Sequence, residues 1–206
     1  MSSIAMYLGQ ILEYIHKFVG SYGIAIIIFT VLIRIILLPF YVKQMGTMKK
    51  MKEIQPYIEE LKKKYGKDPQ KLNVETMKLY KEKNVNPMGG CLPMLLPLLI
   101  LWPLFAMLRS YPAFSTASFL WMHSLSQKDP YYIIPVLAGI TTFISSAMIS
   151  TDKSQKSMNI MMSIFMAWIT VSLPSGVGIY WVTSNIFQIV QQYFFLRESN
   201  TAKGGS

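Results

Sequence analysis

The chain has 206 residues, of which 52% are hydrophobic, and its formal net charge is +10 at pH 7. This composition and the positive mean hydropathy exclude an ordinary soluble globule and indicate an integral membrane protein. Cys91 is the only cysteine in the sequence, which excludes a disulfide framework and a cysteine-based metal site.

The first segment, residues 1–20, is predicted to be an extracytoplasmic amphipathic helix. Its apolar residues recur at helical spacing, with polar residues between them. Such a helix can lie on the outer membrane surface with its apolar face in the lipid. The alternative is an ordinary helix packed against the rest of the protein. The apolar positions are Ile4, Leu8, Ile11, Leu12 and Ile15.

Residues 21–42 are predicted to be the first transmembrane helix, because crossing a bilayer takes about 20 apolar residues. The run contains Arg34, whose side chain cannot lose its charge and is costly in hydrocarbon unless water or a partner meets it. None of the apolar runs contains an Asp or Glu that could serve as a buried counter-ion. Arg34 therefore predicts a wet, positively charged cavity inside the membrane, with Thr30 beside it one helical turn earlier.

Residues 43–87 are predicted to form a cytosolic, antiparallel helical hairpin rich in lysine. The three- and four-residue spacing of a coiled-coil seam recurs in the first half, at Met51, Ile54, Ile58, Leu61 and Tyr65. Pro56 is expected to kink that helix or to mark its restart. A turn signal at residues 66–69 precedes a second helix that continues to about Lys83. The alternative is a solvated loop that only joins two spans. The lysines expected to recruit partners or anionic lipids are Lys52, Lys62, Lys63, Lys64 and Lys67.

Residues 88–197 are predicted to hold transmembrane helices two to five, followed by a tail at residues 198–206. Sixteen positive charges fall in segments predicted to face the cytosol, and three fall on the other side. The positive-inside rule therefore places the N-terminus outside and the C-terminus in the cytosol. The four apolar runs are Cys91–Ser110, Tyr131–Ile149, Met158–Leu173 and Val177–Leu196.

The last apolar run carries most of the remaining polar side chains, and five of them share one helical face. Polar side chains can hold membrane helices together. Contacts of this kind explain one or two polar residues well. They explain poorly a glutamine-rich face in a chain that also has an arginine within an apolar run. The sequence therefore predicts an all-α polytopic membrane protein with five transmembrane helices around a hydrophilic groove. The five residues are Trp181, Ser184, Asn185, Gln188 and Gln192.

Catalysis finds little support in the sequence. His16 and His123 both fall outside the apolar runs, and the sequence contains no nucleotide-binding loop. We therefore expect a protein that is not an enzyme and that uses no metal or cofactor. Nucleic acid is not expected as a direct substrate, because the hairpin mixes six acidic residues among its 12 lysines and lacks an aromatic platform. Two other functions stay open: a small-solute or anion transporter that uses Arg34, and a structural subunit whose groove is filled by a partner helix.

Three long stretches resemble the YidC-type membrane protein insertases of bacteria, and the resemblance covers nearly the whole chain. They are FTVLIRIILLPFYVKQ, KYGKDPQKLNVETMKLYKEKNVNPMGGCLP and LPSGVGIYWVTSNIFQIVQQY. The resemblance implies a five-span core in the bacterial plasma membrane, with a groove that opens to the cytosol and the lipid. Arg34 and Thr30 match residues of that groove. Tyr180 and Trp181 match part of the slide along which substrates leave.

The function implied by the resemblance is that of an insertase or chaperone. Nascent membrane proteins enter the groove from the cytosol, Arg34 attracts an acidic segment, and the apolar helix moves into lipid without nucleotide hydrolysis. Apolar transfer, at roughly 25 cal/mol per Å² of buried surface, supplies the driving force. The Sec translocon, the ribosome and signal recognition particle components are expected partners. Pro97 stands where the family often has a groove glutamine, so we expect a less polar groove on that side.

Overall fold

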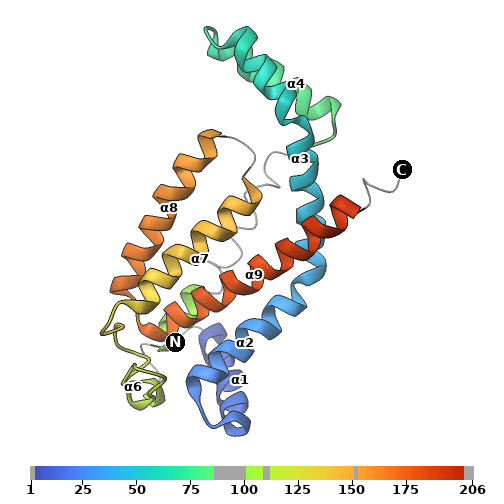
Figure 1. Cartoon of the computed structure of the whole chain (residues 1–206). Coiled ribbons are helices and arrows are strands. Elements are labelled where there is room, and N and C mark those ends of the chain that lie inside the picture. The colour runs from blue at the N-terminus through green and yellow to red at the C-terminus, as the bar shows by residue number, and fades with distance from the viewer. Residues whose placement is uncertain (1–2, 86–100, 109–111, 151–152, 202–206) are drawn as a thin grey trace. The chain divides into compact units, whose positions relative to one another are not determined.

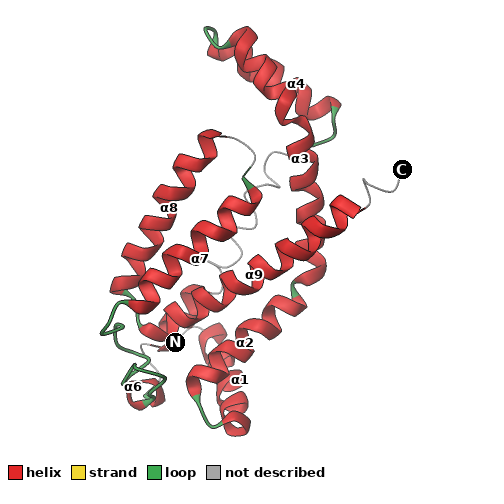
Figure 2. Cartoon of the chain, in the orientation of Figure 1, coloured by secondary structure: helices red, strands yellow, loops and turns green. Residues whose placement is uncertain are grey.

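A computed structural model describes residues 3–85, 101–108, 112–150 and 153–201 of the chain (Figure 1). Within these ranges the ordered elements are all helices, and no strand is present (Figure 2). The chain divides into two compact units, one of Met1–Leu37 with Pro97–Ser206 and one of Leu38–Leu96. Pro97 and most of the predicted second span lie outside the described residues, while residues 101–108 of that span are helical.

The first unit is a helical bundle built around its last helix. In it α7 packs along both α8 and α9, and α2 packs along α9 and α1 (Figure 1). Leu12, Phe29, Leu104 and Tyr180 are among the side chains of its apolar core. The helices are α1 (Ser3–Val19), α2 (Tyr22–Ile36), α6 (Ala113–Thr116), α7 (Ile133–Ile149), α8 (Lys153–Ser172) and α9 (Ser175–Thr201).

The first predicted span is divided in the structure. Instead of one helix over residues 21–42, α2 ends at Ile36 and α3 begins at Leu38. The physical reason is Pro39, which has no N–H to donate to the carbonyl of the residue four positions earlier. Helices α7, α8 and α9 contain the other three apolar runs that fall within the described residues.

Within the described residues, no single helix is both long enough and apolar enough to cross a bilayer by itself. The segments Met6–Val19 and Tyr22–Ile36 reach the required length and hydropathy only as a pair, which is bent by 118° at its break. Ile133–Met148 is a shorter apolar helix.

Helix α1 has two apolar faces rather than one. Leu12 is fully buried in the core, and Leu8 and Ile15 pack against it, so this face contacts the protein. Ile11, which the helical pattern placed with these residues, is instead 47% exposed. It belongs to a second, outward face at spacings of three and four residues, together with Tyr7, Tyr14 and Phe18.

The second unit is a pair of packed helices, α3 (Leu38–Tyr65) and α4 (Pro69–Glu82). Ile54 and Ile58, two residues of the predicted coiled-coil seam, are buried together with Val85. Asp68 begins α4 by accepting a hydrogen bond from the backbone N–H of Lys71 at 3.0 Å, as an N-cap residue does. The chain stays helical through Pro56.

The loop that leads into α7 is organised by Asp129, whose side chain is buried. Its Oδ1 accepts hydrogen bonds from Trp121 Nε1 at 2.8 Å and from the backbone N–H of Tyr131 at 3.1 Å. Its Oδ2 accepts a hydrogen bond from the backbone N–H of Ile134 at 2.6 Å. One carboxylate therefore joins the loop to the first turn of α7, where negative charge is favourable.

Gly178 lets α9 approach α7 and α8 closely, so we expect Gly178→Ala to destabilise the bundle. A Cβ at this position would lie 2.3 Å from Ile134 Cγ2 and 3.3 Å from Thr170 Cγ2. Relieving that overlap costs about 1–3 kcal/mol, which should lower the midpoint of thermal unfolding in detergent by several degrees. Gly46→Ala is the control, because a Cβ there meets nothing within 4 Å. A Gly178→Ala midpoint equal to that of the wild type would contradict this account.

Candidate substrate-binding site between α2 and α9

Arg34 lies in the last turn of α2, where that helix packs along α9. Its Nε donates a hydrogen bond to Ser184 Oγ at 3.0 Å, and its Nη2 donates to the same hydroxyl. Nη2 also lies 3.5 Å from Gln188 Oε1, the longest of these contacts. The structure therefore brings Arg34 of the first predicted span together with Ser184 and Gln188 of the last one.

The α9 side of this site is one stripe with a spacing of four residues. Tyr180 and Ser184 are buried, with exposed fractions of 2% and 1%, whereas Gln188 is only half-buried. Because residues at i and i+4 lie one above the other on a helix, the stripe runs from a closed end at Tyr180 to a more open end at Gln188. Arg34, itself half-buried, lies against the middle of it.

Thr30 is almost fully buried, one turn before Arg34 on α2. Its hydroxyl donates to the carbonyl oxygen of Ile26 at 2.6 Å, a bond within its own helix. This bond satisfies the donor of Thr30 without using Arg34, and it leaves the oxygen of Thr30 able to accept a further hydrogen bond.

A second set of polar residues on α9 faces α7 instead. Trp181 Nε1 donates to Thr142 Oγ1 at 3.1 Å. Asn185 Nδ2 donates to Thr141 Oγ1 at 3.1 Å and to Thr142 Oγ1 at 2.9 Å. Gln192 Nε2 lies 3.4 Å from Ser145 Oγ. These contacts join two helices, as interhelical hydrogen bonds do in membrane proteins.

The predicted polar face of α9 is thus shared between two neighbouring helices. Ser184 and Gln188 point to Arg34 on α2, whereas Trp181 and Asn185 point to α7. Sequence reasoning did not single out Thr141 and Thr142 as the partners on α7. The sequence signal that could have identified them is the pair of adjacent threonines within a largely apolar run.

The predicted recruitment lysines lie in the second unit, on α3 and in the turn that follows it. All five are exposed. Lys64 and Lys71 approach the ring of Tyr65 to 5.3 Å and 5.2 Å from its centroid, within the range of cation–π attraction.

The chemistry available to the α2–α9 site is anion binding. Ser184 and Gln188 orient the guanidinium without neutralising its positive charge, because a hydroxyl and a carboxamide are neutral acceptors. A guanidinium held in this way attracts a carboxylate through its charge, while its Nε and Nη2 donors stay on Ser184 and Gln188. In the part of the chain that the structure describes, no group of His, Cys, Asp and Glu residues could hold a metal ion.

Comparison with known proteins agrees with the sequence resemblance. The family model described as 60Kd inner membrane protein matches residues 14–203. A relative from Caldanaerobacter subterraneus named membrane protein insertase YidC is 78% identical over 206 residues, which is the whole of both chains. A relative of the same name from Fusobacterium nucleatum is 44% identical, over 95% of this chain and 96% of its own.

A solved structure shows the same fold. It is described as an active YidC insertase crystal structure with the first transmembrane domain resolved. The match has a TM-score of 0.80 at 32% identity, and it covers 93% of this chain and 46% of the other. The predicted resemblance is therefore confirmed, and the chain belongs to the 60Kd inner membrane protein family, whose curated members named here are YidC membrane protein insertases.

Proposed function

We propose that the chain is a membrane protein insertase that receives nascent membrane proteins at the α2–α9 site. The observation that carries this proposal is the contact of Arg34 with Ser184 and Gln188 on a neighbouring helix. It places an oriented, permanent positive charge beside a polar stripe. The names of the relatives, which are insertases, support the same function.

The proposed orientation has the N-terminus outside and the C-terminus in the cytosol of a bacterial plasma membrane. Five transmembrane segments surround a hydrophilic groove, with α1 on the outer surface and α3 and α4 in the cytosol. The support is the excess of lysine in the segments assigned to the cytosol. In this orientation the half-buried end of the stripe, at Gln188, lies nearer the cytosol than Tyr180 does.

In the proposed mechanism a short acidic segment of the client enters from the cytosolic end and binds Arg34 transiently. Ser184 and Gln188 hold the guanidinium in place, and Thr30 adds a polar group one turn away on α2. Asn185, a predicted groove residue, holds α9 to α7 instead. The family resemblance assigns the exit of the client's apolar helix to Tyr180 and Trp181. Because Tyr180 is buried and Trp181 donates to Thr142 on α7, α9 must move before a client can contact them. Partition of that helix into lipid supplies the free energy, so no nucleotide is hydrolysed.

Reconstitution tests the proposal directly. The purified chain is placed in liposomes, and a single-span client with an acidic N-terminal segment is synthesised in their presence. We expect protease-protected, correctly oriented client at a level several times that of protein-free liposomes. Equal protection in both liposome preparations would contradict the proposal. The transporter alternative has no support in the comparisons, and an anion flux assay on the same liposomes should give no signal above that of protein-free liposomes.

We also propose that the exposed lysines of the hairpin recruit partners, among them the ribosome, signal recognition particle components, the Sec translocon or anionic lipids. Lys62, Lys63 and Lys64 lie in the last turn of α3, are exposed, and are not part of the apolar cluster of Ile54, Ile58 and Val85. Changing all three lysines to Gln should leave the hairpin folded, because none belongs to its apolar core. It should lower client recruitment by roughly 100-fold, because each of the three lysines contributes on the order of 1 kcal/mol near an anionic surface.

Recruitment is measured as the binding of ribosomes that carry a nascent client to proteoliposomes. The control is the triple change of Lys43, Lys49 and Lys50 to Gln, which removes the same charge from the opposite end of α3. We expect the control to retain most of its binding. Equal binding by both triple variants and the wild type would show that charge at the hairpin turn is dispensable.

A further inference from the structure

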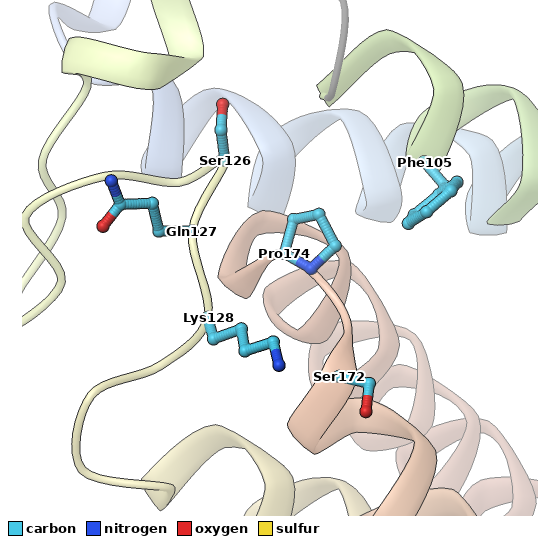
Figure 3. Close-up of a pocket in the computed structure, with 6 residues that line it drawn as sticks. All are labelled: Phe105, Ser126, Gln127, Lys128, Ser172 and Pro174. Carbon is cyan, nitrogen blue, oxygen red and sulfur yellow. The ribbon is translucent and has the colours of Figure 1, made fainter.

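A cavity of about 450 Å³ lies in the first unit, away from Arg34. Its described lining consists of Phe105, Ser126, Gln127, Lys128, Ser172 and Pro174. In Figure 3 the Lys128 side chain extends from its loop toward Ser172, at the end of α8. The Phe105 ring approaches from the neighbouring helical segment. The cavity therefore combines a cation, a hydroxyl and an aromatic wall.

The charge of Lys128 is available to a ligand. The neighbouring carboxylate, Asp129, is buried and accepts hydrogen bonds from three N–H groups, those of Trp121, Tyr131 and Ile134. Lys128 forms no ion pair with this or any other carboxylate of the described residues. An ammonium group beside a hydroxyl in a cavity is suited to binding a phosphate-type anion.

The two helices beside the cavity carry tryptophans on their surfaces. Trp168 precedes Ser172 by one turn on the same face of α8 and is 68% exposed. Trp102 precedes Phe105 by three residues, is 76% exposed, and lies with its ring 6.4 Å from the ring of Phe105. Tryptophans concentrate where a protein crosses between the hydrocarbon and the headgroups of a bilayer.

The positions of Trp168 and Trp102 agree with a bilayer interface at the level of the cavity. In the orientation proposed above, α8 and residues 101–108 both run outward. Trp168 and Trp102 therefore lie deeper in the membrane than the cavity, by about one helical turn or 5 Å. Lys128 lies on the water side of the two rings, as a lysine near the headgroups does.

We propose that this cavity binds the phosphodiester headgroup of a phospholipid from the outer leaflet. Lys128 pairs with the phosphate, the hydroxyl of Ser172 donates a hydrogen bond to it, and the acyl chains lie over Trp168 and Trp102. The site is separate from the client site at Arg34. Only its assignment to the outer leaflet rests on the proposed function.

Native mass spectrometry of the full chain in detergent, titrated with phosphatidylglycerol, tests the site. No client is present, so the result does not depend on insertase activity. We expect Lys128→Gln to weaken retention of the lipid about tenfold, because it removes an ion pair, and Ser172→Ala two- to threefold, because it removes one hydrogen bond from a neutral hydroxyl. Lys17→Gln is the control, because Lys17 is an exposed lysine of α1 that does not line the cavity. It should bind the lipid as the wild type does.

A second titration uses glycerophosphoglycerol, the same headgroup without its acyl chains. Weak binding of this compound, with no displacement of the lipid at equal concentration, supports a lipid site. Binding as tight as that of the lipid, and equally sensitive to Lys128→Gln, would overturn the lipid assignment in favour of a soluble phosphodiester. Equal retention of phosphatidylglycerol by the wild type, Lys128→Gln and Lys17→Gln would overturn the proposal altogether.

Discussion

Arg34→Ala is expected to lower the insertion of clients with an acidic extracytoplasmic segment by about 10- to 100-fold. A hydrogen bond to a charged group contributes about 1.5–3 kcal/mol, and the variant removes the charged donor at the centre of the site. Clients with a neutral segment should insert at nearly the wild-type rate, because partition of their apolar helix into lipid is unchanged. The measurement is the initial rate of insertion into proteoliposomes for a matched pair of clients that differ only in acidic residues.

Two further variants separate charge from geometry at the same position. Arg34→Lys keeps the charge but cannot contact Ser184 through two nitrogens, so we expect an intermediate rate with acidic clients. Ser184→Ala keeps the arginine and removes only its main orienting contact, so its effect should be smaller than that of Arg34→Ala. If Arg34→Ala inserts both the acidic and the neutral client at the wild-type rate, the proposal that Arg34 attracts acidic segments is wrong.

Asp129→Ala is expected to destabilise the first unit strongly. The substitution leaves three N–H groups without their acceptor, a buried one on Ile134 and two part-buried ones on Trp121 and Tyr131. Leaving the buried donor unsatisfied costs about 1–3 kcal/mol, and each of the two part-buried hydrogen bonds contributes about 1 kcal/mol, so a loss of about 3–5 kcal/mol is expected. The thermal unfolding midpoint in detergent should fall by more than it does for Gly178→Ala.

Trp121→Phe is the matched control, because it removes one of the three donors and keeps the carboxylate. Its cost should be about 1 kcal/mol, the net value of a single hydrogen bond. Asp129→Asn should fall between the two variants, since its amide retains one acceptor oxygen. An Asp129→Ala midpoint no lower than that of Trp121→Phe would show that the loop does not depend on this carboxylate.

Much of the helical framework could be predicted from the sequence. The apolar runs predicted helices α7, α8 and α9, because each run is long, periodic and bounded by polar residues or by the turn at Pro174. Arg34 could also be recognised as a functional residue, because a permanent charge within an apolar run costs free energy unless it meets water or a polar partner. Its contact partners lay on the helix whose polar residues had been noted for the same reason.

The division of the α9 face could not be predicted. Ser184 and Asn185 are adjacent in sequence, and a rotation of about 100° per residue separates their directions. A helical stripe this wide can contact two neighbouring helices, and only the packing of α2 and α7 decides which residue faces which helix.

Two other features depend on structure that periodicity does not encode. The contacts of Asp129 join residues eight positions before it and five after it, in a loop without a repeating pattern. The break at Leu37 was signalled by Pro39, but hydropathy alone continued the helix to Val42. In the loop, the deciding groups are backbone N–H donors that bond to Asp129. At the break, the deciding feature is the backbone N–H that Pro39 lacks.

Site-specific photocrosslinking from position 188 is the most direct test of the client site. A photoreactive residue replaces Gln188, which lies beside Arg34, or Ile186, which is 50% exposed on another face of α9. A single-span client is held on a stalled ribosome in membranes that contain either variant. We predict a strong crosslink from position 188 that disappears when the client is released into lipid, and a much weaker one from position 186. No crosslink from position 188 in the folded protein, or equal crosslinks from both positions, would contradict a client site between α2 and α9.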